Sequence, residues 1–247
     1  LVYFILKENP EEIGLSTDGD PKTSGLAGVK KPSFTKGPLE VDDWQKAFHS
    51  WPVWQLCGGY FVCGFTTALI SAHFVPLAIE KGFSPSTAAT AFGVMSALNT
   101  VGVMLAGSLG DRFGRKNILG LVYAFRGFAY ALLLFSPGLW GLWAFAVVAG
   151  VSWVATIPLT TSLTADVYGV RNIGILSGII FTAHQIGGAT SIQFAGITRD
   201  ITGSYTLSLT IALVLLTVAS LISFSIDERK YSIRYSTTLS QPVSHNV

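Results

Sequence analysis

The sequence predicts an all-α polytopic membrane protein with six transmembrane helices. Half of its 247 residues are hydrophobic and only 12% are charged, whereas a soluble domain has about 25% charged residues. The charges are also unevenly placed, because long stretches lack Asp, Glu, Lys and Arg while residues 7–50 and the segment after 226 are polar. Spanning helices produce this pattern, since a free charge is costly inside a bilayer.

Six apolar segments are long enough to cross a bilayer, which takes about 20 residues. They are 52–79, 82–110, two spans within 117–165, then 172–198 and 203–226. The run 117–165 is too long for one helix and carries a single charge, Arg126. Its Ser-Pro-Gly at 136–138 is a turn signal that divides it into the third and fourth spans.

These spans divide the chain into four parts. We expect the end of a preceding transmembrane helix at 1–6, a cytoplasmic central linker at 7–50, the six-helix domain at 51–226, and a cytoplasmic C-terminal tail at 227–247. With this topology, thirteen of the 16 Lys and Arg residues fall on one side and two on the other. The positive-inside rule then predicts a multi-pass protein of the cell membrane with both ends cytoplasmic.

Several classes of function find no support in the sequence. The two cysteines, Cys57 and Cys63, lie in one apolar span and form neither a disulfide framework nor a metal-binding spacing. There is no nucleophile–base constellation, no phosphate-binding glycine loop and no basic aromatic surface. We therefore expect no enzyme activity, no cofactor, no metal and no nucleic-acid partner.

One short turn between the second and third spans concentrates charge. Residues 107–117, GSLGDRFGRKN, hold four charged side chains: Asp111, Arg112, Arg115 and Lys116. The three cations fit a positive-inside anchor. Asp111 does not, because the dipole at the C-terminus of its helix disfavours a negative charge. It is better placed facing an arginine or the N-terminus of another helix, which would make a latch between helices.

Two glycines of this turn also have a physical reason. Gly107 is expected to let another helix approach closely. Gly114 is expected to permit the tight turn that so short a helical hairpin needs.

The ten residues from Gly107 to Lys116 fit the pattern G-x-L-x-D-R-x-G-R-K at every defined position. The pattern resembles the signature turn of the major facilitator superfamily. This resemblance implies the C-terminal six-helix half of a twelve-helix transporter working by alternating access, with the lipid bilayer, an N-terminal half and a small-molecule substrate as partners. It makes Asp111 the latch acceptor, with Arg112 and Arg115 as its cationic partners.

Two other stretches, PEEIGL (10–15) and GITRDITGSY (196–205), look like the branch that contains monocarboxylate transporters and oxalate–formate exchangers. That branch is expected to carry a charged residue within the helix that matches residues 85–109. This helix has none. Anion binding would then fall to Arg126 or to residues outside the chain, or it would not occur.

Polar residues at membrane depth are functional candidates, because each costs several kcal/mol to bury. Arg126 lies about 15 Å along its helix from the charged turn, at 1.5 Å per residue. It is either an anion-binding or gating cation facing a cavity, or a structural arginine paired with backbone carbonyls or with the other half.

Three further polar residues have two interpretations each. His184 could carry a proton during transport, or could be hydrogen-bonded between helices, while its neighbour Gln185 points about 100° away. His73, near Pro76, is either part of an outer mouth or a structural interfacial histidine. Asn99 is either a cavity ligand or an interhelical hydrogen-bonding group.

Gly174 and Gly178 form a GxxxG pair that predicts close helix packing.

The function predicted from these residues is secondary active transport of a small organic anion such as a monocarboxylate, by proton coupling or exchange. A non-transporting receptor or sensor on the same scaffold is an alternative from another class, as is a transporter of a neutral or drug-like solute. The short tail favours transport over signalling. A channel would need rings of carbonyls or charges, and the sequence shows none.

Overall fold

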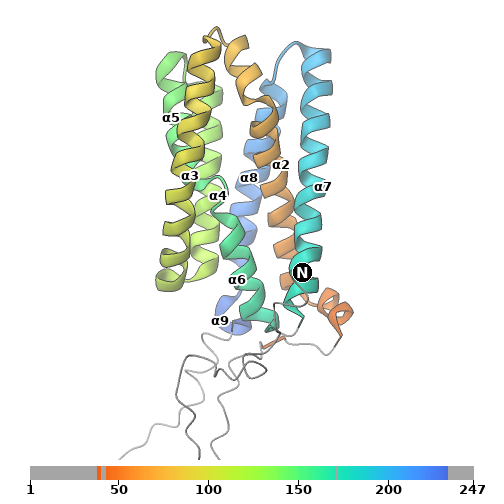
Figure 1. Cartoon of the computed structure of the whole chain (residues 1–247). Helices are drawn as coiled ribbons and strands as arrows, with labels where there is room; N and C mark the ends of the chain where they lie inside the picture. The colour runs from red at the N-terminus through yellow and green to blue at the C-terminus, as the bar shows by residue number, and fades with distance from the viewer. Residues whose placement is uncertain (1–37, 40–42, 171, 233–247) are drawn as a thin grey trace, which may run out of the picture. The chain divides into compact units, whose positions relative to one another are not determined.

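The computed structural model describes residues 38–39, 43–170 and 172–232 of the chain. The predicted helix end at 1–6, most of the predicted linker and the tail from 233 lie outside these residues. Long helices running up and down make up the bundle (Figure 1). No strand occurs among the described residues, so the predicted all-α class is confirmed.

The helices follow one another through short connections. They are η3 (Trp44–His49), α2 (Trp51–Glu80), α3 (Pro85–Phe113), α4 (Arg115–Phe135), α5 (Gly138–Ser152), α6 (Thr156–Tyr168), α7 (Ile173–Thr202), α8 (Thr206–Ser225) and α9 (Glu228–Tyr231). Among the described residues, six helical segments are long and apolar enough to cross a membrane. The fourth of them consists of α5 and α6 together. The six predicted spans are therefore confirmed, each within a few residues of its observed ends.

Local sequence signals place several of the helix ends. Ser84 precedes α3, and its side chain accepts a hydrogen bond from the backbone N–H of Thr87, while Pro85 occupies the first turn. Gly114 separates α3 from α4 with φ +93°, a backbone conformation that favours glycine. The predicted role of Gly114 in a tight turn is thus confirmed.

The fourth span is broken in its middle, which the sequence analysis did not predict. The α-helix α5 ends at Ser152 and α6 begins at Thr156. Pro158 lies in the first turn of α6, where its missing N–H is tolerated. This proline is the signal that could have located the break.

Close backbone contact joins α2 to α7. A Cβ at Gly64 would overlap the carbonyl oxygen of His184, and a Cβ at Gly187 would overlap that of Phe61. Only glycine allows this approach. The predicted close packing at Gly174 and Gly178 is wrong within this chain, because a Cβ at either position would meet nothing within 4 Å. Both lie on a side of α7 that the described chain leaves open.

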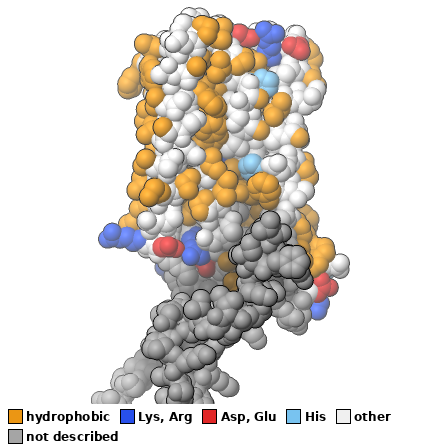
Figure 2. Space-filling view, viewed as in Figure 1, with side chains coloured by type: hydrophobic (Ala, Val, Ile, Leu, Met, Phe, Trp, Pro, Cys, Tyr) orange, Lys and Arg blue, Asp and Glu red, His pale blue; other side chains and the backbone are white. Residues whose placement is uncertain are grey.

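Burial differs sharply among the six spans. In the most apolar 18-residue window, 56% of the residues of α2 and 50% of those of α4 are buried, against 22% in both α3 and α7. Side chains in the middle of the face seen in Figure 2 are hydrophobic or uncharged, and charged side chains gather at its two ends. The helices α3 and α7 therefore have wide faces that the described chain leaves uncovered.

Candidate functional site

The charged turn between α3 and α4 is held by a network of ion pairs. The Arg115 guanidinium contacts Asp111 Oδ1 at 3.1 Å and Asp166 Oδ1 at 2.6 Å. It also donates to the carbonyl of Ser162 at 2.9 Å. Because Asp166 and Ser162 belong to α6, Arg115 ties the turn to the second half of the broken span.

Glu228, just after the last span, completes this network. Its carboxylate accepts the backbone N–H of Arg115 at 3.0 Å and that of Lys116 at 3.1 Å. These two amides lie at the N-terminus of α4, where they have no partner within the helix and where the helix dipole favours a negative charge. Lys116 Nζ donates to the carbonyl of Phe224 at 3.2 Å. The start of α4 therefore contacts both α9, through Glu228, and the C-terminal end of α8, through Phe224.

The sequence analysis missed Asp166 and Glu228. Both are buried, with exposures of 6% and 2%. A signal existed for each, because Asp166 is the first carboxylate after the long run 117–165 and Glu228 follows directly on the sixth span. Their pairing with the turn could not be read from spacing, since 113 residues separate Glu228 from Arg115.

The predicted latch residues are therefore partly paired within this chain. Asp111 contacts Arg115, as expected, whereas Arg112 lies 5.4 Å from the centre of the Phe113 ring. Gly107 was expected to mark a close helix approach, but a Cβ there would meet nothing within 4 Å. Within this chain the close helix approach on α3 is at Gly102, where a Cβ would overlap the backbone carbonyl of Val151 on α5.

Arg126 lies at the break between α5 and α6. It is 1% exposed and donates to the backbone carbonyls of Ser152 and Trp153, where the end of α5 leaves carbonyls without helical partners. Its other contacts are Thr66 Oγ1 at 3.3 Å and Cys63 Sγ at 3.5 Å, both on α2. Of the two interpretations, this geometry matches the structural one with backbone carbonyl partners; anion binding by Arg126 stays a prediction.

Asn99 forms a hydrogen bond with a backbone amide of the same break between α5 and α6. Its Oδ1 accepts the backbone N–H of Val154 at 2.9 Å, across from α3. The interhelical interpretation of Asn99 is the one that this contact matches. Arg126 and Asn99 thus stabilise the free carbonyls and a free amide of one interrupted helix.

His184 and Gln185 act as a pair on α7. His184 Nδ1 lies 3.1 Å from Gln185 Oε1, so the two side chains contact each other although neighbouring positions on a helix point about 100° apart. The imidazole stacks on Phe181, with centroids 5.5 Å apart, and lies 4.9 Å from the Tyr60 ring. Proton transfer by His184 stays a prediction.

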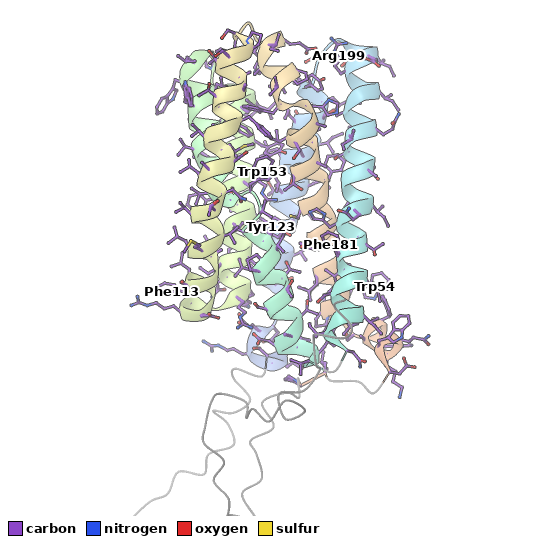
Figure 3. All side chains as sticks on the ribbon, in the orientation of Figure 1. Trp54, Phe113, Tyr123, Trp153, Phe181 and Arg199 are labelled. Carbon is purple, nitrogen blue, oxygen red and sulfur yellow. The ribbon has the colours of Figure 1, made fainter. Side chains whose placement is uncertain are left out.

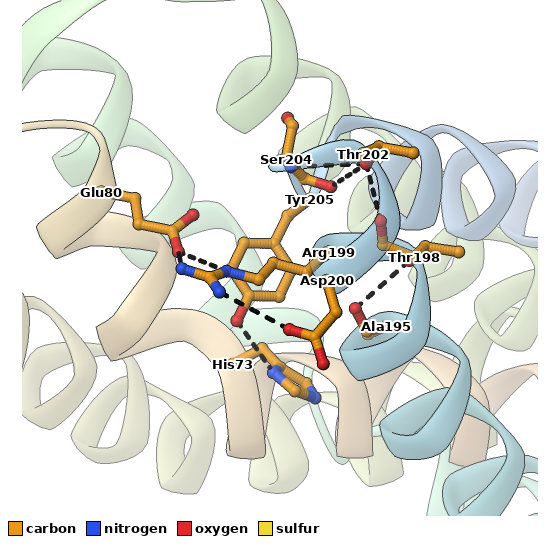
Figure 4. Close-up of polar contacts among 9 residues, drawn as sticks. All are labelled: His73, Glu80, Ala195, Thr198, Arg199, Asp200, Thr202, Ser204 and Tyr205. Carbon is orange, nitrogen blue, oxygen red and sulfur yellow. Dashed lines mark hydrogen bonds and ion pairs between the residues drawn. The ribbon is translucent and has the colours of Figure 1, made fainter.

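His73 belongs to the opposite end of the bundle. Its Nδ1 lies 3.2 Å from the Tyr205 hydroxyl (Figure 4). Its Nε2 lies 3.2 Å from the Ile192 carbonyl oxygen. Nearby, the Arg199 guanidinium contacts Glu80 at 2.7 Å and Asp200 at 3.5 Å. The contacts of His73 match the structural interpretation, since they join α2 to α7 and to the connection before α8.

A bundle of six membrane-spanning helices with charge networks at its ends defines a polytopic helical membrane protein. The sequence profile of the Major Facilitator Superfamily matches residues 1–192. The chain therefore belongs to the Major Facilitator Superfamily.

Relatives and a solved structure agree with this membership. The chain is 32% identical over 173 residues to the uncharacterized MFS-type transporter YcxA of Bacillus subtilis (strain 168), covering 66% of this chain and 41% of that protein. It is 28% identical over 248 residues to monocarboxylate transporter 12-B of Danio rerio, covering 92% of this chain and 50% of that protein. The crystal structure of the POT family transporter PepTSo shares the fold, with TM-score 0.64, 16% identity, and coverage of 74% of this chain and 39% of that one. The chain thus spans half or less of the length of these proteins.

Proposed function

We propose that the chain forms one six-helix half of a secondary active transporter that works by alternating access on a small organic anion such as a monocarboxylate. A second six-helix half supplies the rest of the cavity. The charged turn and both chain ends lie on the cytoplasmic side of the cell membrane. Membership of the superfamily supports this proposal, as does the similarity to a monocarboxylate transporter.

The observation that carries the proposal is the exposed face of α7. His184, Gln185 and Thr182 lie in the middle of this span. Thr182 and Gln185 are exposed and His184 is half-buried. Their hydrogen bonds, between His184 and Gln185 and from Thr182 to Gly178, stay within α7. Polar groups at membrane depth face a bundle interior or a water-filled cavity rather than lipid. A face of this kind fits one wall of a transport cavity whose other wall belongs to the second half.

The buried state of Arg126 supports a second candidate, a transporter of a neutral or drug-like solute. Its guanidinium is engaged with backbone carbonyls at the helix break. In that case the anion selectivity expected of the monocarboxylate branch would be absent.

The experiment is uptake by the complete native polypeptide, purified from membranes and reconstituted in proteoliposomes. Its intact mass, compared with 26.4 kDa for these residues, shows whether the second half is part of the same chain. Uptake of a radiolabelled monocarboxylate that saturates and is inhibited by unlabelled substrate is the expected result. Saturable uptake of neutral solutes alone would establish the second candidate, and binding without any uptake would favour a receptor.

The matched variant is Asp111→Asn, which preserves shape and removes the charge that Arg115 contacts. Uptake by this variant is expected to fall several-fold at equal membrane insertion, because the two-state latch loses its ion pair. Asp200→Asn, at the other end of the bundle, is the control and should transport at the wild-type rate. Equal rates in Asp111→Asn and the wild type would remove the latch from the mechanism.

A further inference from the structure

A pocket of about 290 Å³ lies between α2, α6 and α7. Its lining has aromatic side chains from α2 and α7, aliphatic ones from α6 and α7, and a group of hydroxyls: Thr160, Thr161, Thr164 and Ser177. An apolar cavity of about 150 Å³ is enough to hold benzene. This pocket therefore has room for one ring together with its substituents.

Two rings line one side of the pocket, and a third ring packs against both of them. Tyr60 and Phe181 line it, with centroids 6.3 Å apart. His184 is stacked on Phe181 with an angle of 5° between the ring planes and also lies 4.9 Å from Tyr60. Phe181 is nevertheless 46% exposed, so nearly half of its surface is free to contact another group (Figure 3).

One of the four hydroxyl-bearing side chains of the pocket, Ser177, lacks a hydrogen-bond partner among the described residues. The Oγ of Ser177 is buried. A buried polar atom without a partner is unfavourable, because it has given up its hydrogen bonds to water. A ligand that carries a hydrogen-bonding substituent into the pocket would remove this cost.

We propose that this pocket binds a planar ring of the transported solute, with Ser177 Oγ contacting a polar substituent of that ring. The proposal rests on the transport function and narrows its substrate class to aromatic carboxylates. None of the described residues that line the pocket is charged. The carboxylate of the solute therefore extends out of the pocket, toward the second half of the cavity.

Equilibrium binding of two labelled probes to the complete polypeptide in lipid nanodiscs tests the proposal. Benzoate and cyclohexanecarboxylate have the same charge and nearly the same size, and only benzoate has a π-system. Aromatic contacts are worth about 0.5–1.5 kcal/mol beyond buried area, so benzoate should bind about three- to tenfold more tightly. Equal affinities for the two probes would overturn the proposal.

Phe181→Leu locates the ring preference, because it removes the exposed ring and keeps apolar volume. The variant should lose the three- to tenfold preference for benzoate and retain its affinity for cyclohexanecarboxylate. Phe128→Leu is the matched control, since Phe128 is 56% exposed on α4 and does not line the pocket. A preference that survives in Phe181→Leu would place the ring elsewhere and overturn the proposal.

Two further readouts separate this proposal from the transport function. Ser177→Ala should weaken binding of 4-hydroxybenzoate, whose hydroxyl lies opposite the carboxylate, relative to benzoate, and it covers the case in which Phe181→Leu does not fold. Uptake is measured on the same preparations. Ring-selective binding without uptake would reject transport and retain the pocket, whereas uptake of aliphatic monocarboxylates without ring selectivity would reject the pocket and retain transport.

Discussion

The two ends of the bundle use the same kinds of charge in different surroundings. At the end with the α3–α4 turn, the carboxylates of Asp166 and Glu228 are buried and meet Arg115 and two backbone amides. At the opposite end, the Glu80–Arg199 ion pair has side-chain exposures of 34% and 45%. The first network joins α3, α4, α6 and α9, whereas the second joins only α2 and α7.

This difference matters because burial decides what an ion pair is worth. Removing one partner of a buried pair costs about 3–5 kcal/mol, since the other charge stays in a place with poor solvation. Exposed pairs contribute about 0–1 kcal/mol at most sites. We infer that the turn fixes the arrangement of four helical elements, while the pair at the opposite end adds little to stability.

The largest expected effect comes from breaking the buried pair at Asp166. Asp166→Ala leaves the Arg115 guanidinium without its carboxylate partner on α6 and should lower the free energy of unfolding by about 3 kcal/mol. Thermal unfolding in a Cys57→Ala background, followed with a thiol-reactive dye, measures this, because Cys57 is only partly buried whereas the remaining cysteine, Cys63, is fully buried and reacts only after unfolding. An unfolding midpoint equal to that of the wild type would show that the buried contact contributes nothing.

An intermediate effect is expected at Glu228. Glu228→Gln keeps one acceptor oxygen for the amides of Arg115 and Lys116 but removes the negative charge from the N-terminus of α4. The loss should be about 1–2 kcal/mol, the size of a dipole and charge-assisted hydrogen-bond contribution in a buried site. The same dye assay applies, with Asp227→Asn as the exposed neighbouring control. A midpoint shift in the control as large as that in Glu228→Gln would assign the effect to the tail as a whole.

The sequence predicts the spans well and the contacts between them poorly, for a physical reason. A run without charge that is longer than 20 residues has few structural options, so 52–79 and 82–110 identify their helices directly. The break at 153–155 has no such signature, because its residues are as apolar as their neighbours and only Pro158 marks it. Its stabilisation depends on Arg126 and Asn99, which come from other helices.

The candidate site shows the same limit. The turn 107–116 was found because its residues are consecutive, and the depth of Arg126 followed from its distance along one helix. The partners Asp166, Glu228 and Cys63 lie far away in sequence. Tertiary packing alone brings them together, so no spacing rule could have paired them.

The smallest effect is expected at the end opposite the turn. Glu80→Gln removes an ion pair whose partners are both reached by solvent, and side-chain ordering together with screening by salt offsets most of its attraction. The unfolding midpoint of this variant should match that of the wild type at 0.5 M salt, with the Asp166→Ala variant measured beside it as the sensitive case. A loss as large as that of Asp166→Ala would mean that the two ends are equally fixed, and the burial argument for the turn would fail. The wild-type midpoint in Glu80→Gln, together with a large drop in Asp166→Ala, would show that the close packing of α2 on α7, rather than this ion pair, holds the end of the bundle opposite the turn.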